Sequence, residues 1–184
     1  MADSKVLFGF KNLYVGTYAV ANGTVTLGTP YHQKGAVGFS PEADESESTF
    51  YADDMAYFVE QIGRTRSGDL EVAKFDDEFK TQFLGYVTSG GGGLAEVVNP
   101  TKPNVYIMFE ISGDADARRV IMYNGTLGSI NREYQTIEEN REVVTESLSA
   151  TFTGDEASGI IVDTYKPGDD AYATLFTNPP VPSI

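Results

Sequence analysis

Carboxylates are the side chains of this chain with the most scope for chemistry, because Asp and Glu account for 27 of its 184 residues. Two facing carboxylates can hydrolyse a glycosidic bond, and alternating oxygen ligands around a central Gly can bind Ca²⁺. The densest acidic stretch, residues 42–54, lacks the spacing of a calcium loop. With so many acids, some pair is always available, and Asp114, Asp116, Asp169 and Asp170 fit turns better than ligand sets. We therefore predict no catalytic carboxylate pair and no metal site.

Other catalytic residue types are scarce. His32 is the single histidine and there is no cysteine, which excludes cysteine-ligated metals and multi-histidine metal sites. The glycine run at residues 90–93 is followed by Leu-Ala-Glu rather than the Gly-Lys-Ser/Thr of a phosphate-binding loop. No Gly-x-Ser-x-Gly nucleophile motif is present. The sequence predicts a protein that is not an enzyme and binds no cofactor, with His32 at the surface near a turn.

The charge balance limits the possible partners. Thirteen basic and 27 acidic residues give a net charge of −14, whereas tight binding of nucleic acid needs clustered Lys and Arg. An acidic wall repels phosphate and so favours the passage of DNA over its capture. No apolar run approaches the ~18 residues of a membrane-spanning helix, and the N-terminus lacks the pattern of a signal peptide. We expect synthesis and folding in a cytoplasm, with no membrane partner.

The secondary structure that positions the residues discussed above is predicted to consist mostly of short strands. Runs of Val, Ile, Thr, Tyr and Phe alternate with Gly, Asn, Asp and Pro, which is typical of hairpin-connected strands. Asn22-Gly23 and Asn124-Gly125 are candidate hairpin turns. Residues 105–111 are apolar on both faces and predict a central, buried strand. We expect one domain over residues 1–184, mainly β as a sandwich or barrel, with one flanking helix and long loops.

The one predicted helix covers residues 76–84. Acidic residues at 76–78 suit a helix start, and Gly85 suits its end. Phe75, Phe79 and Phe83 recur every four residues and, with Leu84, form one apolar stripe. The stripe is expected to pack the helix across a sheet or a barrel end, and a docking face for a partner is the alternative.

Three other segments have distinct patterns. In residues 144–153 a period of two places apolar residues on one face and hydroxyl residues on the other, which is an exposed or interfacial face. The hydroxyl residues are Thr145, Ser147, Ser149, Thr151 and Thr153. Residues 40–54 carry only acidic charges and predict a long acidic loop. The proline-rich residues 176–184 predict a C-terminal tail or arm. Glu146 interrupts the apolar face, and the sequence does not explain it.

An ordered set of short strings, covering residues 5–175, resembles the major tail proteins of long, non-contractile-tailed bacteriophages. The most specific is Thr-Phe-Tyr-Ala-Asp-Asp at 49–54. The others are Phe-Gly-Phe-Lys-Asn-Leu-Tyr at 8–14, Gly-Ala-Val at 35–37, Pro-Glu-Ala-Asp at 41–44, Gly-Asp-Leu-Glu at 68–71, Asp-Glu-Phe at 77–79, Leu-Gly-Tyr at 84–86, Phe-Glu at 109–110, Gly-Asp at 113–114 and Arg-Arg-Val-Ile-Met-Tyr-Asn at 118–124.

The resemblance implies a tail tube fold whose subunits form hexameric rings that stack into the conduit for genome ejection. It implies a virion location, with the tape measure protein and DNA in the lumen and tail tip and tail terminator proteins at the ends. Tight DNA binding is not expected. The segment at 40–54 is then a candidate inter-ring loop, and the hydroxyl face is a candidate lumen or interface lining. The loop residues are Pro41, Glu42, Asp44, Glu45, Glu47, Phe50, Tyr51, Asp53 and Asp54.

Other hypotheses remain open at this point. A tail terminator or baseplate hub protein of related fold would stop at one ring, and a secretion-system tube protein would have similar architecture. A β-sandwich module that binds carbohydrate would call for exposed aromatic platforms, usually with Trp, and this chain has no Trp.

Overall fold

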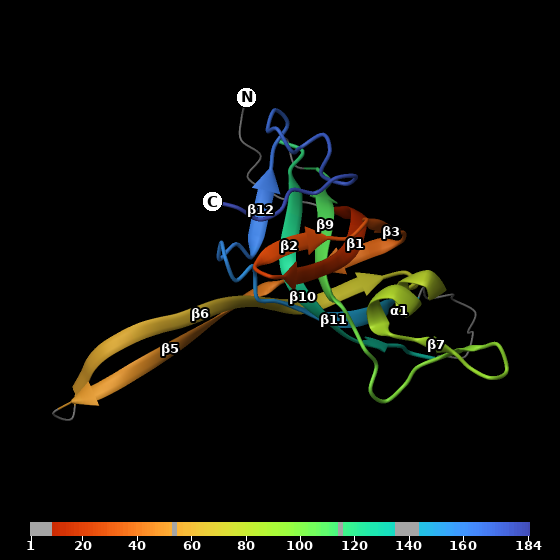
Figure 1. The fold of residues 1–184 in the computed structure, drawn as a ribbon, viewed down its shortest axis with the longest axis horizontal. Coiled ribbons are helices and arrows are strands. Elements are labelled where there is room, and N and C mark those ends of the chain that lie inside the picture. The colour runs from red at the N-terminus through yellow and green to blue at the C-terminus, as the bar shows by residue number, and fades with distance from the viewer. Residues whose placement is uncertain (1–8, 53–54, 114–115, 135–143) are drawn as a thin grey trace.

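The computed structural model describes residues 9–52, 55–113, 116–134 and 144–184. In these residues the chain forms a mainly β fold with one short helix, which confirms the predicted fold class (Figure 1). The elements are β1 (Phe10–Ala21), β2 (Thr24–Leu27), β3 (Tyr31–Gln33), β4 (Ala36–Phe39), β5 (Glu42–Ala52), β6 (Met55–Val72), α1 (Asp77–Leu84), β7 (Val87–Thr88), β8 (Leu94–Ala95), β9 (Asn104–Ile111), β10 (Arg119–Asn131), β11 (Glu146–Phe152) and β12 (Val162–Tyr165).

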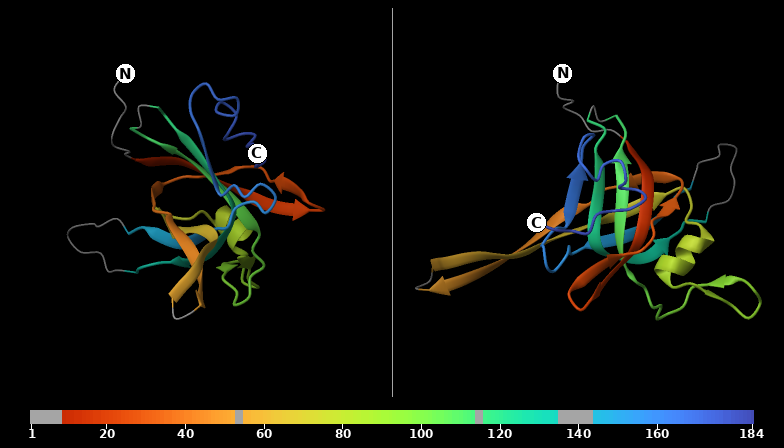
Figure 2. Two further views of the ribbon diagram at one scale, coloured as in Figure 1. Left: turned by 90° about the vertical axis from the view of Figure 1, so that its left-hand side faces the viewer. Right: turned by 45° about the horizontal axis from the view of Figure 1, so that its top comes forward.

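One antiparallel sheet organises the molecule, with the strand order β2-β1-β9-β10-β11-β6-β4. Three further strands pair beside this path, β3 with β1, β12 with β10 and β5 with β6. The sheet curls so strongly that β4, at one end of the order, returns to contact β1. Figure 2 shows the resulting curved body, with β5 and the first part of β6 extending away from it. The curl creates an enclosed interior for apolar side chains.

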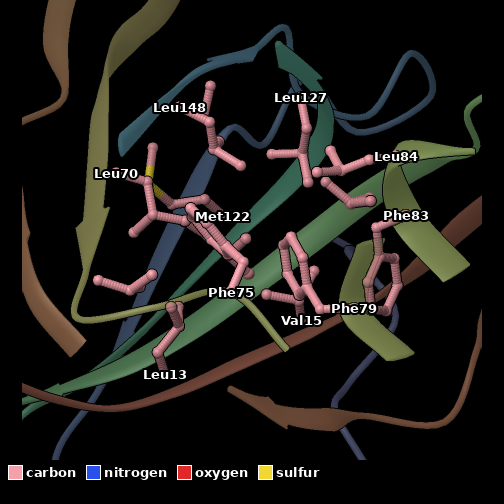
Figure 3. Packing of buried hydrophobic residues seen from close by; sticks show 14 of the residues in the cluster. Leu13, Val15, Leu70, Phe75, Phe79, Phe83, Leu84, Met122, Leu127 and Leu148 are labelled. Atoms are coloured by element: carbon pink, nitrogen blue, oxygen red, sulfur yellow. The ribbon is translucent and has the colours of Figure 1, made fainter. Parts of the chain in front are cut away.

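The main core fills this interior and is closed by the helix (Figure 3). Phe75, Phe79, Phe83 and Leu84 are all buried, which confirms the predicted packing stripe. The Phe75 and Phe79 rings stack with centroids 4.9 Å apart, and Phe83 lies 5.1 Å from Phe79. The helix begins after Asp76 and ends at Gly85, which has the left-handed conformation common at helix ends. Local spacing of large apolar residues therefore predicted both the helix and its buried face.

A second apolar cluster lies on the other side of the same strands. Val105 and Ile107 of β9 face the main core, whereas Tyr106 and Met108 face the second cluster. The prediction that this strand is buried on both faces is confirmed. The C-terminal segment helps to cover the second cluster, because Phe176 stacks on Tyr14 and the Tyr123 hydroxyl donates a hydrogen bond to the Pro180 carbonyl. Residues 176–184 form no strand, as expected, but they pack against the body.

The two Asn-Gly pairs have different structures. Asn22 and Gly23 turn the chain between β1 and β2 with positive φ at both residues, as predicted. The prediction for Asn124 and Gly125 was wrong, because both lie inside β10. Here β10 shifts register against β9, and on its other edge its partner changes from β12 to β11. Asn124 has a positive φ of 53°, and the pair forms an irregularity within a continuous strand.

Gly125 should not tolerate a side chain. A Cβ at this position would lie 2.3 Å from the Phe152 ring, which is fully buried. We expect Gly125→Ala to lower the free energy of unfolding by about 1–3 kcal/mol, the usual cost of overpacking. Gly91→Ala is the control, because a Cβ there meets no atom within 4 Å. Urea unfolding of both variants tests this, and equal midpoints would contradict the proposed clash.

Candidate functional site

The segment at Glu42–Ala52 is a strand, so the predicted long acidic loop at residues 40–54 was wrong. It pairs with β6 from Ala52 opposite Met55 to Glu42 opposite Ser67. The partner strand supplies what the acidic segment lacks: Arg64 forms an ion pair with Glu45, and the Ser67 hydroxyl donates to Asp44. The backbones of Glu47, Phe50 and Tyr51 lie in β5, Pro41 directly precedes it, and Asp53 and Asp54 lie outside the described residues.

The two strands form a long ribbon, defined here as β5 together with residues 55–67 of β6. Among the described residues, β5 pairs only with β6, and β6 meets β11 only from Arg66 onward. Most of the ribbon therefore extends beyond the body with both long edges unpaired (Figure 1). Unpaired edges present rows of backbone N–H and C=O groups that can pair with another strand. The ribbon is thus the part of the described structure best suited to contact a partner.

Next to the ribbon root, β11 confirms the predicted alternation over residues 147–152, whereas Val144, expected on the apolar face, is exposed. Leu148, Ala150 and Phe152 are buried, whereas Ser149 is exposed and Ser147 and Thr151 are half-buried. The register places Ser147, Ser149 and Thr151 opposite Glu71, Asp69 and Ser67 of β6.

Together these side chains line a shallow concavity of about 760 Å³ that includes acidic residues but no Lys or Arg among its described lining. We call this surface the acidic face. Its residues are Glu42, Asp44, Ser67, Asp69, Glu71, Thr145, Ser147, Ser149 and Thr151. Thr145 donates its hydroxyl hydrogen bond to Glu71, whereas Thr153 lies beyond the strand and donates to the Asn124 carbonyl.

Glu146, which the sequence did not explain, binds the backbone of the segment just before α1. Its carboxylate accepts a hydrogen bond of 2.7 Å from the Phe75 backbone N–H and forms an ion pair of 2.7 Å with Arg132. A charged acceptor satisfies a backbone donor well where water is partly excluded. An acidic residue therefore occupies this position at the start of β11 because the segment before α1 needs an acceptor there.

Two arginines, missed by the sequence analysis, lie on the opposite side of the ribbon root. Arg64 and Arg66 alternate with Thr65 and Ser67, so their side chains point away from the acidic face. Together with Glu45, they line a groove of about 550 Å³ against residues 159–162. We call this surface the arginine face. The spacing Arg-Thr-Arg within a β-rich run was the signal that could have revealed it.

No catalytic arrangement is found in the described residues. His32 lies in β3, exposed as predicted, and its ring stacks on Tyr14 with centroids 4.5 Å apart. Across the same part of the chain, no group of three or more His, Asp or Glu residues could hold a metal ion, and no helix is long and apolar enough to cross a membrane. Shifted pKa values are found at packed side chains rather than at a catalytic site. For example, burial, with the nearby Asp76, raises the pKa of Tyr31 to about 12.

Comparisons with solved structures give thirteen similar chains, including the two below. No protein-family model and no curated protein matches the chain. The tube-terminating cap of the anti-feeding prophage aligns over 90% of this chain and 96% of its own, with 12% identity and a TM-score of 0.44. The sheath/tube terminator of an extracellular contractile injection system, PVC, in its extended state aligns over 84% and 93%, with 11% identity and a TM-score of 0.42.

Proposed function

We propose that this chain is a structural subunit of a phage-type tail tube, which assembles into rings and stacks them into a conduit for DNA. The observation that carries the proposal is the ribbon, a two-stranded extension with unpaired edges beyond a well-packed body. Such edges favour pairing with strands of neighbouring copies, and head-to-tail contacts between identical copies close into rings. The ordered strings that resemble major tail proteins support the same function.

The surface charge is compatible with this role. A subunit whose net charge is −14 repels the phosphates of DNA and so favours sliding over binding. In the proposed assembly, hexameric rings enclose the tape measure protein and later the DNA. The tail tip and the tail terminator are the partners at the two ends of the tube, and the assembled protein belongs to a virion tail.

A tail terminator is the second candidate function. A terminator would use the same ribbon within one ring but would not add further rings. The two structures compared above, the anti-feeding prophage cap and the PVC sheath/tube terminator, are terminating proteins. For this reason the test below must separate a single closed ring from a growing tube.

Electron microscopy of the purified protein at rising concentration tests the proposal. We expect hollow tubes of stacked rings, with tail tip added as a nucleus where spontaneous growth is slow. Single rings that never elongate would contradict the tube function and support the terminator function. A chain that stays monomeric under every condition, tail tip included, would overturn both.

A further inference from the structure

The ribbon root has two faces of opposite charge. Neighbouring residues of a strand point to opposite sides, and β6 pairs without a register shift from Arg66 to Val72. Leu70 points into the core, so Arg66 lies on the core side of the sheet and Asp69 lies on its outer side. Four carboxylates without a described basic residue on one side thus oppose two guanidinium groups and one carboxylate, that of Glu45, on the other.

The arginine face retains unused binding capacity. Arg64 forms an ion pair with Glu45, but its side chain is still 57% exposed. Arg66 lies opposite Ala43 of β5 and Phe152 of β11, and it has no ion-pair partner among the described residues. Both arginines border the groove beside residues 159–162, which offers a wall of backbone and aliphatic side chains. Guanidinium groups at such a groove suit carboxylates, which they can bind with two parallel hydrogen bonds.

We propose that the arginine face of one copy binds the acidic face of a neighbouring copy. The inference rests on the proposed function, because head-to-tail contacts in a ring or stack bring two different faces of the same subunit together. The occupant is a second copy because the acidic face supplies the complementary charge on the same ribbon. Charge complementarity also fixes the direction of assembly, since like faces repel each other.

The test uses charge reversals at two positions of β6. Arg66→Glu leaves one guanidinium beside two carboxylates on the arginine face. Asp69→Lys weakens the negative charge of the acidic face. Each variant should therefore raise the concentration needed for assembly by about tenfold. The double variant R66E/D69K keeps the net charge and exchanges the charges at these two positions only, so it should recover part of the assembly that R66E loses. Lys34→Glu and Asp170→Lys are matched controls, because both residues are exposed and lie away from the ribbon.

Light scattering and electron microscopy give the readout, and thermal unfolding followed by circular dichroism shows whether each variant folds. Arg66→Gln removes the charge without adding repulsion and should have an intermediate effect. If wild type assembles but R66E assembles like K34E, or if R66E/D69K assembles no better than R66E, the inference is overturned while the proposed function stands. If wild type never assembles, both fail.

Discussion

A chain in which Asn-Gly replaces residues 46–63 is expected to fold but to form neither rings nor tubes. Glu45 and Arg64 lie opposite each other, so a two-residue turn can join them and close a short hairpin. The pairing of β6 with β11, which begins at Arg66, and with β4, which begins at Leu70, stays intact. Because the unpaired edges beyond the body are removed, we expect complete loss of assembly in electron microscopy, with a free energy of unfolding close to that of wild type.

The matched control removes another projecting hairpin. Replacing residues 89–93 with Asn-Gly shortens the connection between β7 and β8, whose paired ends are Thr88 and Leu94. This variant should assemble like wild type. Rings from the chain with the shortened ribbon would show that assembly depends on another surface. Loss of assembly in both variants, with normal unfolding, would show that the effect is not specific to the ribbon.

Local sequence patterns were enough to predict the elements that contribute buried residues to the core. The spacing of Phe75, Phe79 and Phe83 depends only on helix geometry, and it placed α1 and its buried face correctly. The alternation in β11 and the two-sided apolar character of β9 likewise depend on strand geometry. In each case the residues that decide the structure lie within one element, so a single sequence contains the whole signal.

The ribbon could not be predicted in the same way because its stabilising partners are distant in sequence. Glu45 and Asp44 gave a self-repelling acidic pattern, and their partners Arg64 and Ser67 lie about twenty positions later. Asn124-Gly125 has the same turn chemistry as Asn22-Gly23, but the packing of Gly125 against Phe152 keeps it inside β10. Both errors arise where tertiary pairing overrides a local preference.

The largest loss of stability is expected at Phe79. Its side chain is fully buried where α1 closes the core, and its ring contacts those of Phe75, Phe83 and Tyr31. Phe79→Ala removes a ring from a packed site and leaves a cavity, which should lower the free energy of unfolding by about 3–5 kcal/mol. A domain of this size is stable by only about 5–15 kcal/mol, so urea unfolding should begin at much lower concentrations than in wild type.

Gln82→Ala separates the loss of core packing from any effect on the helix itself. Gln82 is exposed on the same helix and bonds only to Glu78 among its described partners, so its replacement should change stability by less than about 0.5 kcal/mol. If Phe79→Ala and Gln82→Ala unfold at the same urea concentration, α1 does not close the core. Because assembly binds only folded chains, rising protein concentration should recover part of the stability that Phe79→Ala loses. That recovery should disappear when residues 46–63 are also replaced, which links the packing of the body to the function of the ribbon.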